Sequence, residues 1–280
     1  MTSTHETAPP STTPLAAPLS APLARTVRGS GPGLLLAHGA GGGIEANYGP
    51  ILDGLAARHT VVGVDYPGAG DSPRSLTPLD VDTLADELVA AADAEGVGRF
   101  AVSGYSLGGP VAIRVAARHP ERVDALVLSA TFAYADTRTD LVASVWRQLL
   151  AADDPRLLGE FVQLMALGEG ALNTLTPDEV RAAAELITAT VPPGTGDQVE
   201  LVRRIDVRED LAAITVPALV IVTTADPLVS PTLQRALAAG LPGSETAELP
   251  TGHLPFAERP QEWLALITGF LARHREGRVA

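Results

Sequence analysis

The residues of this chain that most directly indicate chemistry are Gly-Tyr-Ser-Leu-Gly at positions 104–108, with Ser106 at the centre. An apolar run, residues 100–102, precedes them and a run of helical character, residues 111–117, follows, so the sequence predicts a strand, a tight turn and a helix. In such a turn the serine adopts a strained backbone conformation that exposes its hydroxyl group, and the flanking glycines leave the space that the turn needs. The N–H groups of the following helix point toward the same place. We therefore predict that Ser106 is a nucleophile.

An acid and a base follow Ser106 along the chain. Asp226 comes after a long apolar run at residues 216–224, and His253 comes after a second predicted strand at residues 244–249. A carboxylate at the end of a buried strand can accept a hydrogen bond from an imidazole and fix its tautomer, and the imidazole can then take the proton of a serine. The sequence thus predicts a triad in the chain order serine, aspartate, histidine.

Each of these three residues also has a purely structural interpretation. Ser106 could occupy such a turn without performing chemistry, as in binding proteins that share an enzyme fold. Asp226 precedes Pro227 and could simply begin a turn, in which case Asp136 is the nearest alternative for the acid. His253 could be an ordinary loop histidine. The occurrence of all three in one order favours the catalytic interpretation.

A glycine-rich turn supplies a further feature that acyl transfer requires. Apolar residues 34–37 lead into His-Gly-Ala-Gly-Gly-Gly at positions 38–43. Acyl transfer creates a negatively charged oxygen, and each N–H donor that stabilises it contributes roughly 3–4 kcal/mol. We predict that the N–H groups of Ala40 and Leu107 form this oxyanion hole. The turn could instead bind a phosphate, although it lacks the Gly-Lys-Ser/Thr ending of a phosphate-binding loop. His38 is expected to pack the turn.

Together these motifs resemble those of the α/β-hydrolase superfamily over residues 26–275. The matching segments are residues 36–42, 64–72, 104–109, 226–229 and 252–254. The resemblance implies an α/β fold with a mostly parallel eight-stranded sheet, helices on both faces, a Ser-His-Asp site at the strand ends and a helical cap inserted after strand 6. Two departures stand out. Ala69 occupies a position where many relatives have histidine, and prolines between residues 9 and 22 disfavour the two N-terminal antiparallel strands.

The order of apolar and amphipathic segments agrees with this fold. Strands are expected near residues 33–38, 60–65, 99–104, 123–129, 216–224 and 244–249, and helices near residues 46–58, 79–95, 107–118, 231–240 and 260–274. Strands that alternate with helices form crossover units and hence a parallel sheet. We expect a disordered tail rich in Pro, Thr and Ala over residues 1–25, followed by a hydrolase core over residues 26–280.

The alternation stops between residues 131 and 210, where only helices are predicted. These helices are expected at residues 140–150, 155–167, 177–190 and 198–205, and residues 192–196 interrupt them as a possible hinge. A helical insertion at this point would cover the active site and determine the substrate. The candidates for an apolar substrate pocket are Phe132, Tyr134, Trp146, Phe161, Met165, Leu167 and Leu228. Each of them could equally be a packing residue.

Composition limits the possible partners. The chain has 280 residues and a formal net charge of −13, and all 20 of its basic residues are arginine. This charge argues against nucleic acid or an anionic membrane surface as a partner. Cysteine is absent, the histidines lack the spacing of a metalloprotease, and no run is long enough to span a membrane. Since no early basic residue or apolar stretch forms a secretion signal, we expect a cytoplasmic enzyme without metal or cofactor. The oligomeric state stays open.

The predicted function is that of a serine hydrolase. Ser106 would attack a carboxylic ester, lactone or thioester of a small, largely apolar substrate and form an acyl-serine. An apolar roof over Ser106 would make kcat/KM for neutral esters rise from acetate to medium acyl chains and fall when the pocket is full. Three alternatives remain: a lyase or cyclase that uses the triad as a proton relay, a cofactor-free perhydrolase, and a ligand-binding receptor.

Overall fold

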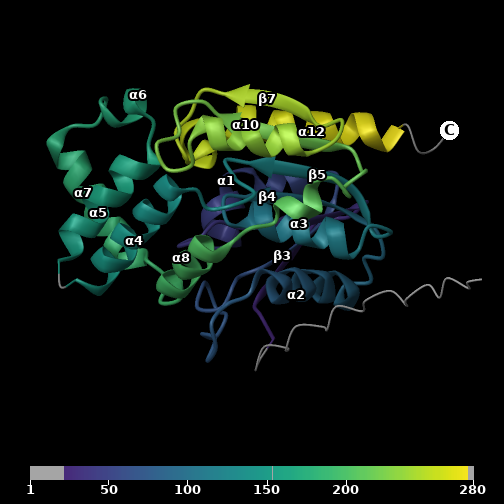
Figure 1. The fold of residues 1–280 in the computed structure, drawn as a ribbon, viewed down its shortest axis with the longest axis horizontal. Helices are drawn as coiled ribbons and strands as arrows, with labels where there is room; N and C mark the ends of the chain where they lie inside the picture. The colour runs from purple at the N-terminus through teal and green to yellow at the C-terminus, as the bar shows by residue number, and fades with distance from the viewer. Residues whose placement is uncertain (1–21, 153, 277–280) are drawn as a thin grey trace, which may run out of the picture.

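A seven-stranded sheet forms the centre of the chain in the computed structural model, which describes residues 22–276 except residue 153 (Figure 1). The strands lie in the order β1-β3-β2-β4-β5-β6-β7, and every pairing is parallel except that of β1 with β3. Their bounds are β1 Arg25–Arg28, β2 Gly33–Ala37, β3 Thr60–Val64, β4 Phe100–Tyr105, β5 Val123–Ser129, β6 Ala218–Thr223 and β7 Glu245–Leu249.

The predicted fold class is confirmed, but the number of strands is one lower than the eight expected, within the described residues. One antiparallel strand, β1, precedes the parallel ones instead of two. The stretch before it is interrupted by prolines, which cannot donate to a strand ladder. Residues 1–21 of the predicted disordered tail lie outside the described residues. Its last residue, Arg25, is the first residue of β1.

Burial explains why the central strands are apolar throughout. Every residue of β2, β4 and β6 is buried, as expected for parallel strands that helices cover on both faces. The edge strands differ, because β1 is largely exposed and β7 alternates between partly buried and exposed residues. The strand ends therefore lie in a rigid, water-excluding core, which is a suitable support for a precisely built site.

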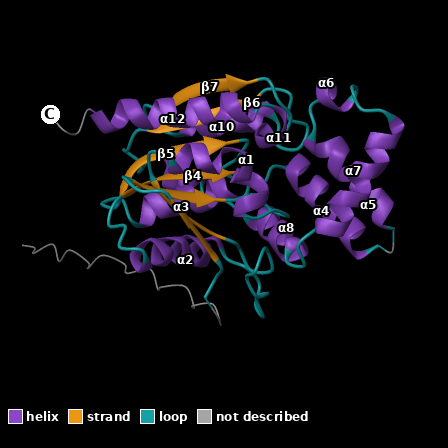
Figure 2. Cartoon of the chain, turned by 180° about the vertical axis from the view of Figure 1, so that it is seen from behind, coloured by secondary structure: helices purple, strands orange, loops and turns teal. Residues whose placement is uncertain are grey.

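Helices pack on both faces of the sheet (Figure 2). One face carries α1 (Ile44–Ala56) and α12 (Pro260–Glu276), with the short α11 (Pro255–Glu258) beside them. The other face carries α2 (Val81–Ala94), α3 (Gly108–Arg118) and α10 (Pro231–Gly240). Each layer has its own apolar core against the sheet.

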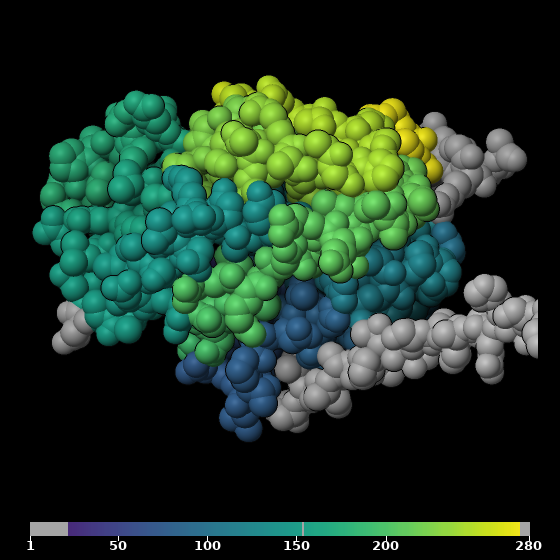
Figure 3. Space-filling view, viewed as in Figure 1, coloured from purple at the N-terminus to yellow at the C-terminus, as the bar shows by residue number. Residues whose placement is uncertain are grey.

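The insertion predicted over residues 131–210 is helical and lies between β5 and β6. It follows the fifth strand rather than the sixth, because the described sheet has one N-terminal strand fewer than expected. Its helices are α4 (Thr137–Ala151), α5 (Pro155–Ala166), α6 (Glu169–Leu172), α7 (Pro177–Thr190), α8 (Thr195–Arg204) and α9 (Arg208–Leu211), of which the short α6 and α9 were not predicted. In Figure 3 most of this cap forms a lobe at one end of the molecule.

Local sequence explains how the cap helices form. Helix α7 begins with a capping box, in which Thr176 and Glu179 satisfy each other's backbone N–H groups. Helices α5 and α7 pack so closely that a Cβ atom at Gly159 would lie only 2.5 Å from the backbone of Ala184. The side chain of Gln163 also donates to the Val180 carbonyl oxygen across this contact, at 3.0 Å. The cap is therefore a packed unit of its own.

Candidate active site

Ser106 lies at the tip of a strained turn between β4 and α3. Its φ angle is +51°, in the left-handed region that side chains other than glycine rarely adopt. Three hydrogen bonds hold this conformation: the Ser106 N–H donates to the Ser129 carbonyl oxygen, and the Ser106 carbonyl oxygen accepts from Thr131 Oγ1 and from the Gly109 N–H. The strain is thus sustained by the neighbouring strand β5.

The two outer glycines of the turn are required by close backbone contacts. A Cβ atom at Gly104 would lie 2.4 Å from the Gly108 carbonyl oxygen, and one at Gly108 would lie 2.0 Å from the Ala37 carbonyl oxygen. Real Cβ atoms do not approach a carbonyl oxygen so closely. The Gly-x-Ser-x-Gly spacing therefore follows from the close packing of this turn on itself, at Gly104, and against β2, at Gly108.

His253 lies within hydrogen-bonding distance of Ser106. Its Nε2 atom is 2.9 Å from Ser106 Oγ, and its Nδ1 atom is 2.8 Å from Asp226 Oδ2. The backbone around the histidine is fixed from two sides: its carbonyl oxygen accepts from the Tyr105 hydroxyl group at 2.9 Å, and its N–H donates to the Ala166 carbonyl oxygen at 2.7 Å. Since Ala166 ends α5, the cap itself helps to position this histidine.

Asp226 accepts hydrogen bonds at both carboxylate oxygens. Oδ1 accepts from the N–H groups of Leu228 and Val229, at 2.8 and 2.9 Å. Oδ2 accepts from Thr223 Oγ1 at 2.9 Å and from Gln234 Nε2 at 3.2 Å, in addition to the histidine. The side chain of Asp226 is fully buried. These hydrogen bonds hold the carboxylate in an orientation in which Oδ2 faces the imidazole.

Asp136, the alternative acid, has a different place. It precedes α4, and its carboxylate accepts from the Thr139 N–H at 2.8 Å, so it caps that helix. The imidazole of His253 is hydrogen-bonded to Asp226 instead.

The glycine-rich turn after β2 presents the Ala40 N–H group to the cavity that Ser106 lines. The Gly39 N–H donates to Asn47 Oδ1 and the Gly41 N–H donates to Gln198 Oε1, both at 2.9 Å. Between them, the Ala40 N–H has no protein acceptor within the described part of the chain. Ala40 and Ser106 line the same cavity. The Ala40 N–H is thus available to a bound oxygen, as the predicted oxyanion hole requires.

His38 is a structural residue of this turn. It is fully buried, stacks on the Tyr66 ring at 3.9 Å and lies between two backbone groups, the Gly39 carbonyl oxygen and the Tyr66 N–H. One ring nitrogen must donate and the other accept, which only the neutral imidazole can do. Burial accordingly lowers the pKa of His38 to about 4.

Two cavities open onto Ser106. The larger has a volume of about 420 Å³ and lies beneath the cap helices α5 and α7. Among the residues that line this cavity, His253 and Tyr105 are the titratable ones, and there is no arginine, aspartate or glutamate. The smaller has a volume of about 30 Å³ and lies toward α4 and α8. Both are bounded mainly by apolar side chains.

The structure distributes the predicted pocket residues unequally. Trp146 and Leu228 line both cavities, Phe161 and Met165 line the larger one, and Phe132 lines the smaller one. Tyr134 and Leu167 line neither. Tyr134 instead pairs with Asp206 in an isolated bridge, and the Arg208 guanidinium group lies 4.2 Å from the centre of its ring. Tyr134 therefore packs the base of the cap.

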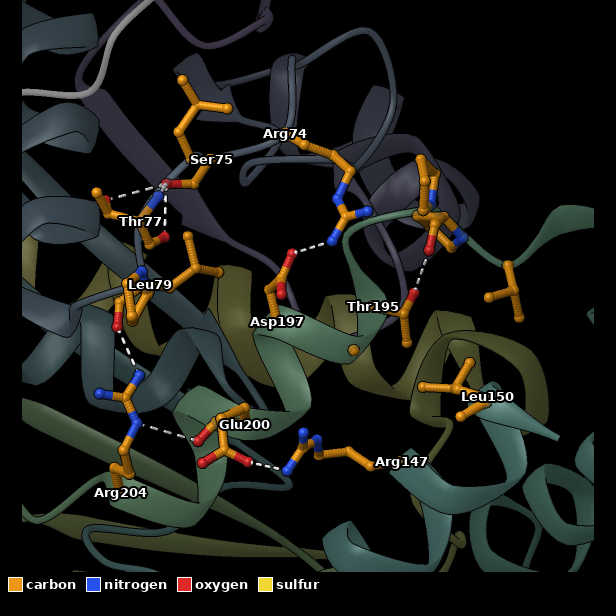
Figure 4. Close-up of a pocket in the computed structure, with 17 residues that line it drawn as sticks. Arg74, Ser75, Thr77, Leu79, Arg147, Leu150, Thr195, Asp197, Glu200 and Arg204 are labelled. Carbon is orange, nitrogen blue, oxygen red and sulfur yellow. Dashed lines mark hydrogen bonds and ion pairs between the residues drawn. The ribbon is translucent and has the colours of Figure 1, made fainter.

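A further cavity of about 620 Å³ lies between residues 74–79 and the cap, away from the triad (Figure 4). Its charged side chains are paired: Arg74 with Asp197 at 2.7 Å and Arg147 with Glu200. Arg204 donates to the Leu79 carbonyl oxygen at 2.8 Å. No nucleophile and base meet there among the residues that line it, so its larger volume does not make it the candidate active site.

The sequence did not indicate several residues that support the triad. Gln234, fully buried in α10, donates to Asp226 and Thr223. Gln198, fully buried in α8, links the Gly41 N–H to the Pro67 carbonyl oxygen. Glu258 accepts from the Gly252 N–H at 3.0 Å and from another glycine N–H in the cap. A polar residue on the apolar face of a predicted helix is the one sequence signal that could have identified the two glutamines.

These contacts form a relay from a serine through an imidazole to a carboxylate. Such a relay can take the proton of the serine hydroxyl as the oxygen attacks a carbonyl carbon, and free N–H groups nearby can stabilise the resulting oxyanion. Within the described residues, no cluster of three or more His, Asp or Glu side chains could hold a metal ion, and no helix is long and apolar enough to cross a membrane. The relay lies where the strands of a parallel sheet end, as in the capped α/β hydrolases.

Comparison with known proteins agrees with this class. Residues 32–260 match the family model of the alpha/beta hydrolase fold, and the chain belongs to this family. It is 34% identical to a pyrrolizixenacetamide deacetylase from Xenorhabdus hominickii, over 88% of this chain and 92% of that protein. It is 30% identical to a putative carbamate hydrolase from Azorhizobium caulinodans, over 87% of this chain and 92% of that protein.

A solved structure supports the same fold. The enol-lactonase from Burkholderia xenovorans superposes with a TM-score of 0.79 at 23% identity, covering 89% of this chain and 96% of that chain. The named relatives are hydrolases, and this chain is a hydrolytic enzyme.

Proposed function

We propose that this protein is a serine hydrolase that cleaves a neutral, largely apolar ester, lactone or thioester through an acyl-serine intermediate. Ser106 Oγ attacks the carbonyl carbon while His253 Nε2 takes its proton, and Asp226 holds the imidazole in the tautomer that can do so. The observation that carries the proposal is the relay itself, with 2.9 Å from Ser106 to His253 and 2.8 Å from His253 to Asp226.

The second half of the reaction uses the same groups. The histidine gives its proton to the leaving group, the acyl-serine forms, and His253 then activates the water that hydrolyses it. The N–H groups of Ala40 and Leu107 stabilise the oxyanion in both steps. Neither step needs a metal or a cofactor, and the cytoplasmic location expected from the sequence stays a prediction.

The walls of the site support a neutral substrate. The cavity of about 420 Å³ has no arginine and no carboxylate among its lining residues, so a charged substrate would lose its hydration there without a partner. Two of the relatives are named as a pyrrolizixenacetamide deacetylase and a putative carbamate hydrolase. They favour acyl transfer to water over the lyase, cyclase, perhydrolase and receptor alternatives, and they add amides to the substrates that should be examined.

The experiment that tests this proposal is labelling with a fluorophosphonate probe, followed by mass spectrometry of the labelled peptide. We expect one label on Ser106, none in Ser106→Ala, and a far-ultraviolet circular dichroism spectrum that is the same in both proteins. Undiminished labelling of Ser106→Ala would remove this residue as the nucleophile. A labelled Ser106 without turnover of any ester, thioester or amide would favour the lyase or cyclase alternative.

A further inference from the structure

The two cavities at Ser106 share a wall. Ala40, Ser106, Trp146 and Leu228 line both cavities. On one side, α5, α7 and the segment after β7 enclose about 420 Å³. On the other side, α4, α8 and the segments after β5 and β6 leave about 30 Å³. A substrate whose carbonyl carbon reaches Ser106 must therefore place its two ends in spaces of very different size.

The position of His253 determines which end enters which cavity. The protonated imidazole must give its proton to the leaving group, so the leaving group has to lie on the side of His253. His253, Leu254 and Phe256 line the larger cavity, and none of them lines the smaller one. With the oxyanion directed to the N–H groups of Ala40 and Leu107, the direction left for the acyl chain is the smaller cavity.

The smaller cavity limits the acyl chain to a few atoms. A water molecule, which is about as large as a methyl group, needs roughly 10–15 Å³ of such volume, so about 30 Å³ holds two or three carbon atoms. The walls are formed by Phe132, Val142, Ala143, Val199, Val202 and Val229, together with Thr139. Because Phe132 and Val199 are almost fully buried, this space cannot widen without repacking the core.

We infer that the enzyme removes short acyl groups, acetyl above all, from bulky, neutral, apolar alcohols or amines. This inference rests on the proposed function and adds its substrate class. The bond between Ser106 Oγ and the acetyl carbon forms as the bond to the leaving oxygen or nitrogen breaks, and the leaving group departs with the proton from His253. Water then adds to the acetyl-serine, releases acetate and restores the serine hydroxyl group. The medium-chain optimum predicted from the sequence is the competing expectation, and the comparison of two esters below decides between the two.

Two isomeric esters with the same carbon count provide the test. Heptyl acetate places the long chain on the leaving-group side, whereas methyl octanoate places it on the acyl side, and their hydrophobicity is nearly the same. Because one methylene too many in an apolar pocket changes kcat/KM by about 10-fold or more, we expect heptyl acetate to be preferred at least that strongly.

A matched pair of variants assigns the preference to the cavities. Val142→Ala enlarges the smaller cavity and is expected to raise the ratio of butanoyl to acetyl turnover about fourfold or more, which is the contribution of one buried methylene. Ile187→Ala enlarges the larger cavity and is expected to change the preferred alcohol while the acyl ratio stays the same. Both side chains are only partly buried, so both proteins should fold.

The outcomes separate this inference from the proposed function. Preference for methyl octanoate, or equal turnover of both esters, with Ser106 labelled by the probe, overturns the short-acyl assignment and leaves the serine hydrolase intact. Hydrolysis of neither ester, without labelling of Ser106, overturns both. Should Val142→Ala fail to fold, the comparison of the two esters on the unmodified enzyme still decides the question.

Discussion

The carboxyl ends of the strands and the helical cap supply different parts of this enzyme. Ser106, Asp226 and His253 follow β4, β6 and β7, and each is at most 8% exposed. Their polar atoms are held by several hydrogen bonds apiece. The cap contributes apolar walls instead, and several of its large apolar side chains remain exposed, among them Leu141, Leu164 and Leu186. In the proposed function, the fixed polar contacts perform the chemistry and the shape of the cap determines the selectivity.

The separation is incomplete, because the cap also reaches the catalytic groups through backbone contacts. The Ala166 carbonyl oxygen accepts from the His253 N–H, and the side chain of Gln198 accepts from the Gly41 N–H. A third contact joins the Gly194 N–H to the Gly68 carbonyl oxygen at 2.9 Å. The cap can therefore either shape the pocket alone or also set the geometry of the reaction, and the variants below distinguish these two roles.

The largest effect on kcat is expected at the carboxyl ends of the strands, for the variant Asp226→Asn. The amide would present an N–H toward the imidazole and favour the wrong tautomer, so kcat should fall by about 10⁴-fold. Asp136→Asn is the matched control, because asparagine caps a helix almost as well as aspartate and kcat should stay the same. Both are measured with one activated ester. If kcat fell less than tenfold in Asp226→Asn and fell strongly in Asp136→Asn, Asp136 would be the acid of the triad.

A second large effect concerns stability and pH at His38. The pKa of His38 is near 6.5 in the unfolded chain, and burial lowers this pKa to about 4 in the folded protein. Between these values the unfolded state holds more protons, so acid favours unfolding. The stabilisation is fully present above about pH 6.5 and is lost as the pH falls toward 4, about 3 kcal/mol in total.

Urea unfolding at several pH values checks this prediction against His38→Gln. The carboxylates titrate in both proteins, so the difference between the two curves isolates the histidine. We expect the free energy of unfolding of the variant to depend less on pH between about 6.5 and about 4. Parallel curves would contradict the burial of a neutral His38.

What the sequence predicted follows the same division between the sheet and the cap. The strands, the turn around Ser106 and the order of the three site residues come from short segments with strict local geometry, such as the close contact of Gly108 with Ala37. Those three side chains lie together in the structure as predicted. Their roles in catalysis stay predictions until they are tested.

The pocket could not be predicted to the same degree. Helical periodicity indicates that Trp146 and Phe161 are apolar cap positions, and Tyr134 precedes the first predicted cap helix. Neither observation shows how the cap lies on the sheet. The structure places Trp146 between two cavities and Tyr134 in neither. Gln198 was missed because its partners are 131 and 157 residues away in the sequence. Such positions depend on long-range packing, which no local pattern contains.

A moderate effect is expected for the contact between the cap and the oxyanion loop. Gln198→Met keeps the size of the side chain and removes both hydrogen bonds, which frees the Gly41 N–H and loosens the turn that holds Ala40. Loss of one oxyanion donor costs about 10²- to 10³-fold in kcat, so a displaced donor should cost up to about 10²-fold with KM nearly unchanged.

Gln163→Met is the matched control for this contact. Gln163 is also a buried glutamine of the cap, but it joins α5 to α7 and does not contact the loop. Each variant leaves buried partners unpaired and should lose about 1–3 kcal/mol of stability. Only Gln198→Met should lower kcat. An equal loss of kcat in both would mean that the cap acts through its general stability and not through the oxyanion loop.

The smallest expected effect concerns the wall between the two cavities, in Trp146→Ala. The indole ring packs against Gly41 and borders both cavities, so its removal should join them into one space. We expect the preference for heptyl acetate over methyl octanoate to fall by about tenfold, while fluorophosphonate labelling of Ser106 continues. Phe161→Ala is the control, because this ring lines the larger cavity only and its loss should change the preferred alcohol without changing that ratio. If Trp146→Ala kept the full preference for heptyl acetate, the wall between the cavities would not limit the acyl chain. The selectivity would then have to come from the segments at the carboxyl ends of the strands.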